Sequence, residues 1–218
     1  MAIVLAGRAP FPKDQRRLIM QFSMLLQTTL LSEPAPQRAP VGRQGGTPRP
    51  RTQRPAVTQS YAHFALGLRY EDIPSDVTEV AREQIVATVG SCYTGSMMPA
   101  ASSMLRGLSI FGAGGPATLF GAGERLSAPA AALYNSAVAQ VIDFDDWVII
   151  SHSGAAVVPT AFAAGEAAGV SGRELITAVV IGNEINARTS RAIQRGAYVG
   201  NSLPNHQVEA ALIASRLL

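Results

Sequence analysis

Apolar residues recur at intervals of three and four along most of the chain, which is the spacing that buries one face of an α-helix. Residues 75–95 keep this spacing directly after Pro74. Residues 128–144 keep it after Ser127, and the proline at their second position suits the first turn of a helix. Both segments are predicted to be helices.

Three later segments extend the helical pattern. Residues 155–169 are apolar nearly all round, which predicts a helix buried among others. Ser171 and Glu174 form an S-x-x-E capping box and so predict a helix start, and residues 206–218 predict a last helix. Only residues 116–121 resemble a strand. The body of the chain is therefore predicted to be all-α.

The helical periodicity is absent from residues 32–58, which are rich in proline, glycine, glutamine and arginine. Such a segment buries too little apolar surface to offset the entropy cost of ordering, so we predict that it is disordered. Residues 1–60 also hold nine of the eighteen Lys/Arg but only two of the fifteen Asp/Glu. The chain therefore divides into a basic arm, residues 1–58, and a helical body, residues 59–218. Within the arm, residues 16–31 are read either as part of an organellar targeting segment or as an incidental extension.

Deleting residues 1–57 is expected to leave the folding of the body intact, because no predicted core element lies in the deleted part. Thermal unfolding followed by circular dichroism would measure this, with the complete chain as the reference. A fall in the melting temperature of more than about 4 °C, which corresponds to roughly 1 kcal/mol in a domain of this size, would contradict the division.

The composition favours a globular body. Hydrophobic residues make up 47% of the chain and charged residues 15%, which suits a packed core. No run reaches about 18 consecutive apolar residues, so a membrane-spanning helix is not expected. The single cysteine, Cys92, excludes an internal disulfide and any four-cysteine metal site within the chain. It is predicted to be a buried thiol, and this cysteine usage fits a reducing, cytoplasmic location.

The least regular stretch reads QVIDFDDWVIISHSG, from Gln140 to Gly154. Its three aspartates, at positions 143, 145 and 146, follow an apolar helix, although aspartate is unfavourable at the negative end of the helix dipole. Such a local conflict often marks a functional site. In a helix the first and third aspartates would share a face, whereas in an extended segment the first and second would.

Three interpretations of this stretch stay open from the residues alone. It is a solvated loop, a divalent-cation site formed by the carboxylates and His152, or a metal-free acid/base site. In the third case one carboxylate orients or binds while the histidine, whose ordinary pKa lies near neutrality, moves a proton. The spacing lacks the H-x-x-x-H and EF-hand patterns, so no metal and no cofactor is assigned. Trp147 is read either as a pocket-lining or as a core residue, and His63 as a packed or surface helix residue.

Four stretches of the body, taken in order, resemble the N-terminal helical part of the MmgE/PrpD family, which contains dehydratases and decarboxylases. They are residues 71–96, 117–146, 151–188 and 209–218. The resemblance implies a helical domain that continues into a smaller α+β domain, which this chain is expected to lack. It also implies dimers, and chemistry on small di- and tricarboxylic acids without metal or cofactor.

The resemblance also implies site residues. The first aspartate of the family's D-F-D-D run and the histidine of a following H-P-S-G face the substrate. They match Asp143 and His152, although Ser153 replaces the proline. Gln140 stands where the family commonly has a histidine, and Ala87 stands where it usually has an aspartate.

A second active-site histidine of the family corresponds to Gly200 when the last stretch is counted back without gaps. His206 lies six residues later and becomes a substitute only through a local shift in the alignment. In the resulting hypothesis His152 is the acid/base, and Asp143 fixes its tautomer or binds a substrate hydroxyl. Polyanionic substrates also need cationic or N–H donors. The candidate substrate-binding residues are Asp146, Gln140, Ser151, Ser153, Arg188 and Arg191.

The leading hypothesis is a lyase domain, a dehydratase or decarboxylase acting on small carboxylic acids. One alternative is a non-catalytic or incomplete chain that needs a partner, and another is an epimerase or isomerase of the same family. The last helix ends on two leucines without a glycine or asparagine stop signal, so a second copy of the chain or another partner is expected to cover it. No nucleic-acid partner is expected, because no aromatic residues lie between the arginines of residues 32–58. No membrane partner is expected either.

Overall fold

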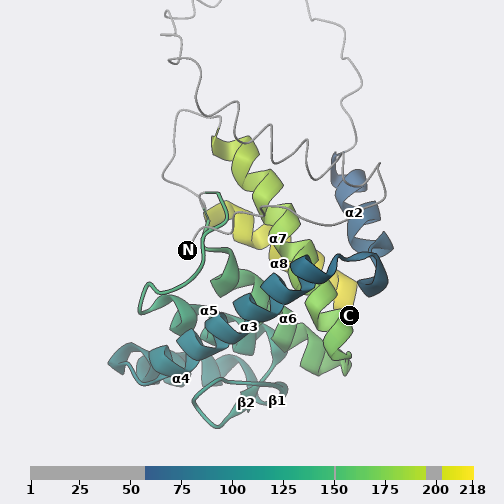
Figure 1. Ribbon diagram of the computed structural model, residues 1–218. Coiled ribbons are helices and arrows are strands. Elements are labelled where there is room, and N and C mark those ends of the chain that lie inside the picture. The colour runs from purple at the N-terminus through teal and green to yellow at the C-terminus, as the bar shows by residue number, and fades with distance from the viewer. Residues whose placement is uncertain (1–56, 150, 195–202) are drawn as a thin grey trace, which may run out of the picture. The chain divides into compact units, whose positions relative to one another are not determined.

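The computed structural model describes residues 57–149, 151–194 and 203–218, and the predictions for residues 1–56 and for Gly200 lie outside this part of the chain. The described body is helical, with one small antiparallel sheet (Figure 1). Its helices are α2 (Val57–Gly67), α3 (Ser75–Ser96), α4 (Pro99–Gly112), α5 (Ala128–Gln140), α6 (Ser153–Ala168), α7 (Gly172–Gln194) and α8 (Leu203–Leu217), with a 3-10 helix, η1 (Tyr70–Asp72). The strands are β1 (Ala113–Thr118) and β2 (Arg125–Leu126). The all-α prediction is confirmed.

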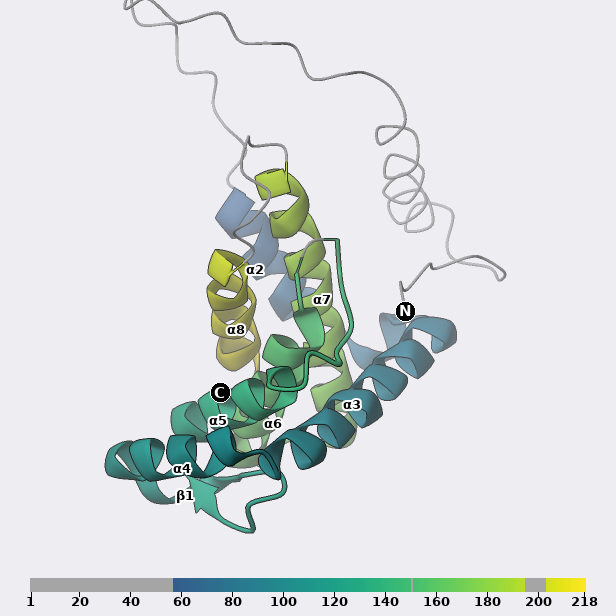
Figure 2. The same cartoon turned by 90° about the vertical axis from the view of Figure 1, so that its left-hand side faces the viewer.

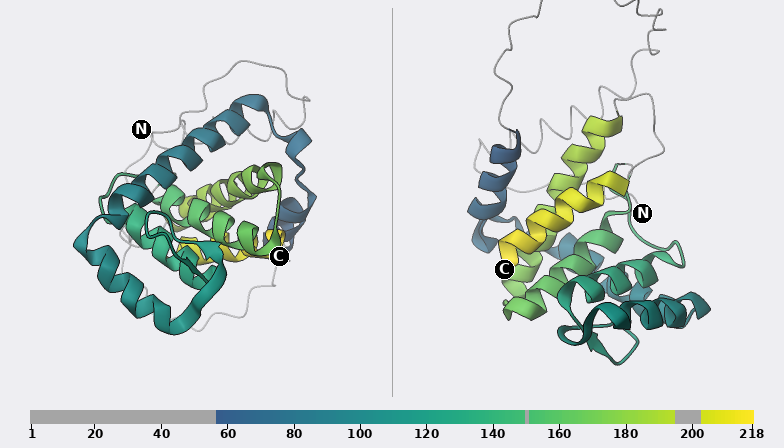
Figure 3. Two further views of the ribbon diagram at one scale, coloured as in Figure 1. Left: turned by 90° about the horizontal axis from the view of Figure 1, so that it is seen from below. Right: turned by 180° about the vertical axis from the view of Figure 1, so that it is seen from behind.

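Helix α6 lies at the centre of the body. It packs against α5, α7, α8, α3 and β1, and α3 and α8 lie on opposite sides of α6 and α7 (Figures 2 and 3). Val157, Val158 and Ala161 of α6 are fully buried, because a helix that is apolar nearly all round is covered on every side. The prediction of a buried helix in this segment is confirmed. Among the described helices none has both the length and the apolarity to cross a membrane.

Helix α7 begins with the predicted capping box. The backbone N–H and the hydroxyl of Ser171 each donate to Glu174 Oε2 at 2.8 Å. These hydrogen bonds lower the pKa of the Glu174 carboxyl, because they favour its ionised form. The capping box therefore satisfies N–H groups that the first turn of the helix leaves without partners.

Helix α5 ends at Gln140, so the expectation that the helix continues to residue 144 is wrong in its last turn. The carbonyl of Gln140 accepts the N–H of Asp143 at 2.9 Å, and Asp143 has a φ of 51°. A continued helix would place aspartates at its negative end, whereas the turn releases them from the helix.

The apolar side of α8 is covered from within the chain. Ile213 and Leu217 are buried, in a cluster with residues of α6 and α7. A Cβ atom on Gly182 would lie 2.5 Å from Ile213 Cδ1, so this glycine allows α7 and α8 to approach closely. The expected partner is therefore not needed for this side of α8. Leu218 remains exposed, and a partner at that end stays a prediction.

Two further residue predictions can be compared with the fold. Cys92 is fully buried, and burial raises the pKa of its thiol to about 12. A thiol in this state is not a reactive nucleophile, which agrees with the predicted structural role. His63 lies exposed on α2, as the surface alternative predicts.

Candidate active site

The loop of residues 141–152, which we call the acidic loop, joins α5 to α6. Within the described chain, the non-glycine residues with positive φ are Asp143 and Ile149, at 51° and 64°, and both lie in this loop. Positive φ is unfavourable for a β-branched residue such as isoleucine. Backbone strain of this kind persists where the surroundings hold it, and it often occurs at functional sites.

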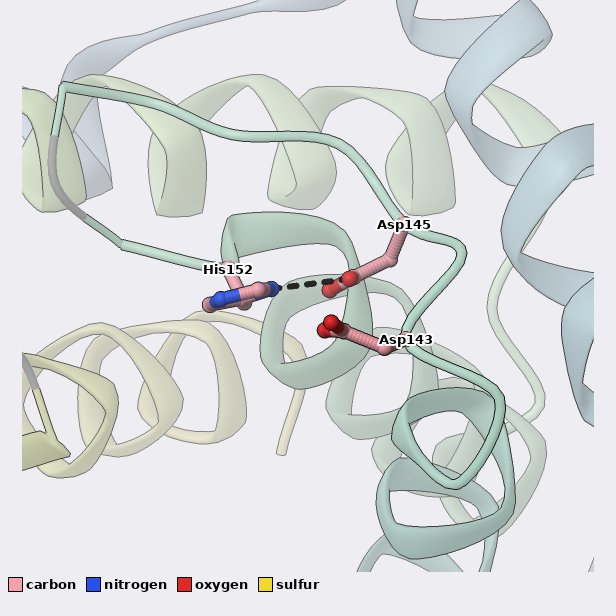
Figure 4. Close-up of side chains that lie close together, drawn as sticks. All are labelled: Asp143, Asp145 and His152. Atoms are coloured by element: carbon pink, nitrogen blue, oxygen red, sulfur yellow. Dashed lines mark hydrogen bonds and ion pairs between the residues drawn. The ribbon is translucent and has the colours of Figure 1, made fainter.

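The centre of the site is a hydrogen bond between His152 and Asp145 (Figure 4). His152 Nδ1 lies 2.8 Å from Asp145 Oδ1, and the Asp145 side chain is only 1% exposed. An ionised carboxylate can only accept, so Nδ1 carries a proton and donates it. This arrangement fixes the tautomer of His152 and leaves Nε2 as the nitrogen that can act on a substrate.

Asp143 lies beside this pair. Figure 4 shows its carboxylate pointing toward the carboxylate of Asp145 and the imidazole of His152, and one ligand atom from each of the three residues lies within 4.8 Å of the others. Gln140 Nε2 is 3.3 Å from both Asp143 Oδ1 and His152 Nδ1. Because the Nδ1 proton is directed at Asp145, the amide of Gln140 donates to Asp143. The structure thus brings together Asp143, His152 and Gln140, and it adds Asp145, which the sequence analysis gave no role.

Asp143, Asp145 and His152 could together hold a divalent cation, since two carboxylates and an imidazole form a suitable donor set. Such a cation would take the Nδ1 lone pair of His152 and displace the proton that this nitrogen shares with Asp145. The donor set therefore fits a cation only after that hydrogen bond is broken. The metal-site interpretation stays an alternative.

Asp146 points away from this group and binds the start of α6. Its Oδ2 accepts from Gln84 Nε2 at 2.5 Å, and its carboxylate also accepts the backbone N–H of Gly154. Burial raises the pKa of Asp146, and the hydrogen bond from Gln84 opposes this effect. Asp143 and Asp145 therefore share a side of the acidic loop, as the extended interpretation predicts. The contacts of Asp146 are structural ones, and its role in substrate binding stays a prediction.

A buried polar stripe on α3 supports the acidic loop, and the sequence analysis missed it. Gln84 binds Asp146, and Ser91 Oγ donates to the carbonyl of Phe144 at 2.8 Å. Thr88 is buried between them, so the three polar residues lie at the helical spacing i, i+4, i+7. This spacing was the available signal. Ala87, at the position of the family's aspartate, is exposed on the same helix.

The two candidate serines face α7. Ser153 Oγ donates to Asn183 Oδ1, and Ser151 Oγ accepts from Asn186 Nδ2 at 3.0 Å. Both serines are fully buried. Their hydroxyls therefore fix the end of the acidic loop, and binding of substrate by them stays a prediction.

The candidate arginines lie in the last two turns of α7. Arg188 forms an ion pair with Glu184, one turn earlier, and its guanidinium lies over the ring of Phe64 at 5.9 Å. These contacts hold Arg188 against α2. Arg191 is half-buried further along the same helix. Their proposed contact with an anionic substrate stays a prediction.

The ring of Trp147 lies against that of His152. Its ring centroid is 4.4 Å from that of His152, and 53% of the residue is exposed. Of the two interpretations of Trp147, core packing is therefore wrong. The indole instead packs beside the imidazole and remains partly exposed.

Replacing Gly154 with alanine is expected to destabilise the fold by about 1–3 kcal/mol, because overpacking forces neighbouring atoms apart. A Cβ atom here would overlap Asp146 Oδ1 and lie 2.9 Å from Thr88 Oγ1. Urea unfolding would measure the effect. Gly90→Ala is the matched control, since a Cβ at this position in α3 meets nothing within 4 Å. Equal stability of Gly154→Ala and the wild type would contradict the packing described for Asp146.

A cis-aconitate decarboxylase of Aspergillus terreus is 32% identical over 152 residues, which cover 66% of this chain and 31% of that protein. A cis-aconitate decarboxylase-like protein of Aspergillus oryzae is 26% identical over 146 residues, which cover 63% of this chain and 30% of that protein. The chain thus spans about a third of the length of these relatives. The family model described as the MmgE/PrpD N-terminal domain matches residues 59–218, more than half of the chain, and the chain therefore belongs to the MmgE/PrpD family.

Proposed function

We propose that the chain is the helical domain of a lyase that removes CO₂ or water from small di- or tricarboxylic acids by metal-free acid/base catalysis. The observation that carries the proposal is the hydrogen bond from His152 to the buried Asp145, which leaves Nε2 for the substrate. The names of the relatives support the decarboxylase form of the reaction.

In the decarboxylation, the bond between the departing carboxylate and its neighbouring carbon breaks, and CO₂ leaves without the electron pair. The imidazolium form of His152 gives its Nε2 proton to the carbanion that remains. Asp145 accepts the Nδ1 hydrogen bond throughout and stabilises the positive ring. In a dehydration, the neutral ring would instead take a proton from the carbon next to a carboxylate, and the imidazolium so formed would give that proton to the hydroxyl, which leaves as water.

The charge of the site sets a further requirement. Asp143 and Asp145 are acidic, so a substrate with two or three carboxylates needs cationic donors nearby. Arg188 and Arg191 are the candidates on α7. We propose that further donors come from protein that corresponds to the rest of the relatives' length.

The match covers only 31% of the Aspergillus terreus relative, and this favours a second candidate. In this candidate the chain is inactive until a partner or a further domain completes the site. An epimerase that moves a proton without losing CO₂ or water is compatible with the same residues. The cytoplasmic location and the homodimer remain predictions.

The test is an assay of CO₂ release from cis-aconitate, with dehydration of 2-methylcitrate as a second arm. The chain is assayed alone, and also joined to the C-terminal part of the Aspergillus terreus relative. Turnover that survives a chelator supports the proposal. Turnover abolished by the chelator would favour the cation site, and failure of both forms on both substrates would contradict the lyase assignment.

A further inference from the structure

Helix α8 carries a second histidine–carboxylate pair. His206 Nδ1 lies 2.6 Å from Glu209 Oε1, and Glu209 is fully buried. The other carboxylate oxygen, Oε2, is buried without a hydrogen-bond partner among the described residues. A buried carboxylate is costly unless it is paired, so the Nδ1 proton of His206 is directed at Glu209.

The other side of His206 meets the acidic loop. Its Nε2 lies 3.4 Å from Ser151 Oγ. With the Nδ1 proton directed at Glu209, a neutral ring accepts at Nε2, so the hydroxyl of Ser151 donates to His206. The same hydroxyl accepts from Asn186 Nδ2 at 3.0 Å. Ser151 is therefore held from α7 and from α8 together.

The position of Ser151 affects the backbone that carries His152. The backbones of Val148 and Ser151 exchange two hydrogen bonds, of 2.9 and 3.1 Å, across the strained Ile149. Strained backbone persists when its surroundings determine it. The next residue is His152, whose ring must reach Asp145 at 2.8 Å. A shift of Ser151 would carry His152 with it.

We infer that His206 and Glu209 are positioning residues, which act through Ser151 to hold His152 against Asp145. This inference rests on the proposed function of His152. It gives His206 a role different from the one considered with the family resemblance, in which a shifted alignment would make it a substitute active-site histidine, and it gives Glu209 a role that no motif assigned.

The first test measures the position of His152 without any substrate. Trp147 is the only tryptophan in the chain, and its ring lies against the imidazole of His152. Its fluorescence lifetime therefore reports on this contact. We expect His206→Phe and Glu209→Gln to change the lifetime in the same direction as His152→Phe. His63→Phe, which alters an exposed histidine on α2, is the control and is expected to leave it unchanged.

The second test uses the active form of the protein with cis-aconitate. A misplaced catalytic group slows the reaction more than it weakens binding, so we expect His206→Phe to lower kcat about tenfold, with KM changed by less than about threefold. His206→Gln keeps an amide near the position of Nε2 and is expected to restore part of the loss. If His206→Phe does not fold, His206→Gln replaces it in both tests.

The two readouts separate the inference from the proposed function. A wild type without turnover would remove the proposed function, and the lifetimes would still test the positioning role. Unchanged lifetimes in His206→Phe and Glu209→Gln would overturn the inference. A large loss of kcat with an unchanged lifetime would overturn it too, because His206 would then act on the substrate directly.

Discussion

Replacing His152 with glutamine is expected to lower kcat by about two orders of magnitude or more, which is the typical effect of losing a general acid/base. Glutamine occupies similar space and can still contact Asp145, but it cannot carry a proton to or from the substrate. The loss should therefore appear in kcat rather than in KM. The measurement is steady-state turnover of cis-aconitate by the active form of the protein.

The control for this prediction is His63→Gln. His63 lies exposed on α2, so it tests whether the loss of any histidine disturbs the protein. Thermal unfolding of both variants shows whether the fold is kept. Near-normal turnover by His152→Gln would end the assignment of His152 as the acid/base.

The helices were accessible from sequence because their signals are local. The apolar spacing of α3 and the capping box at Ser171 depend on residues within a few turns of each other. The end of α5 was placed too late, since the apolar pattern continues past Gln140. The turn at Asp143 depends on a positive φ, which an aspartate adopts only occasionally.

The site was accessible only in part, because its partners are distant in sequence. The spacing placed Asp143 and Asp145 on one side if the loop was extended, but it did not show which of them reaches His152. The support from Gln84 on α3 and from His206 on α8 depends on tertiary packing. For Gln84, Thr88 and Ser91 the available sequence signal is the helical spacing of polar residues, whose burial the structure shows.

Asparagine substitutions at Asp145 and Asp143 are expected to show which of the two carboxylates contributes more to kcat. We expect Asp145→Asn to lower kcat by about 100-fold or more, because loss of the orienting carboxylate leaves histidine in the wrong tautomer in comparable acid–histidine pairs. The amide also removes the charge that stabilises the imidazolium. An amide that kept its oxygen toward Nδ1 would bury its –NH₂ group at the position of Oδ2, which has no hydrogen-bond partner in the described chain, so the –NH₂ group is expected to turn toward Nδ1 instead.

Asp143→Asn is the matched comparison, since it changes an exposed carboxylate of the same loop by the same atom. The family resemblance assigns the substrate-facing role to Asp143, whereas the hydrogen bond in the structure belongs to Asp145. If Asp143 binds a substrate hydroxyl, its variant should raise KM, with a loss in kcat of about tenfold or less, because that contact is present in the ground state as well. Turnover by both variants over a range of cis-aconitate concentrations gives the ranking. A larger kcat loss in Asp143→Asn than in Asp145→Asn would mean that the two carboxylates exchange roles when the substrate binds.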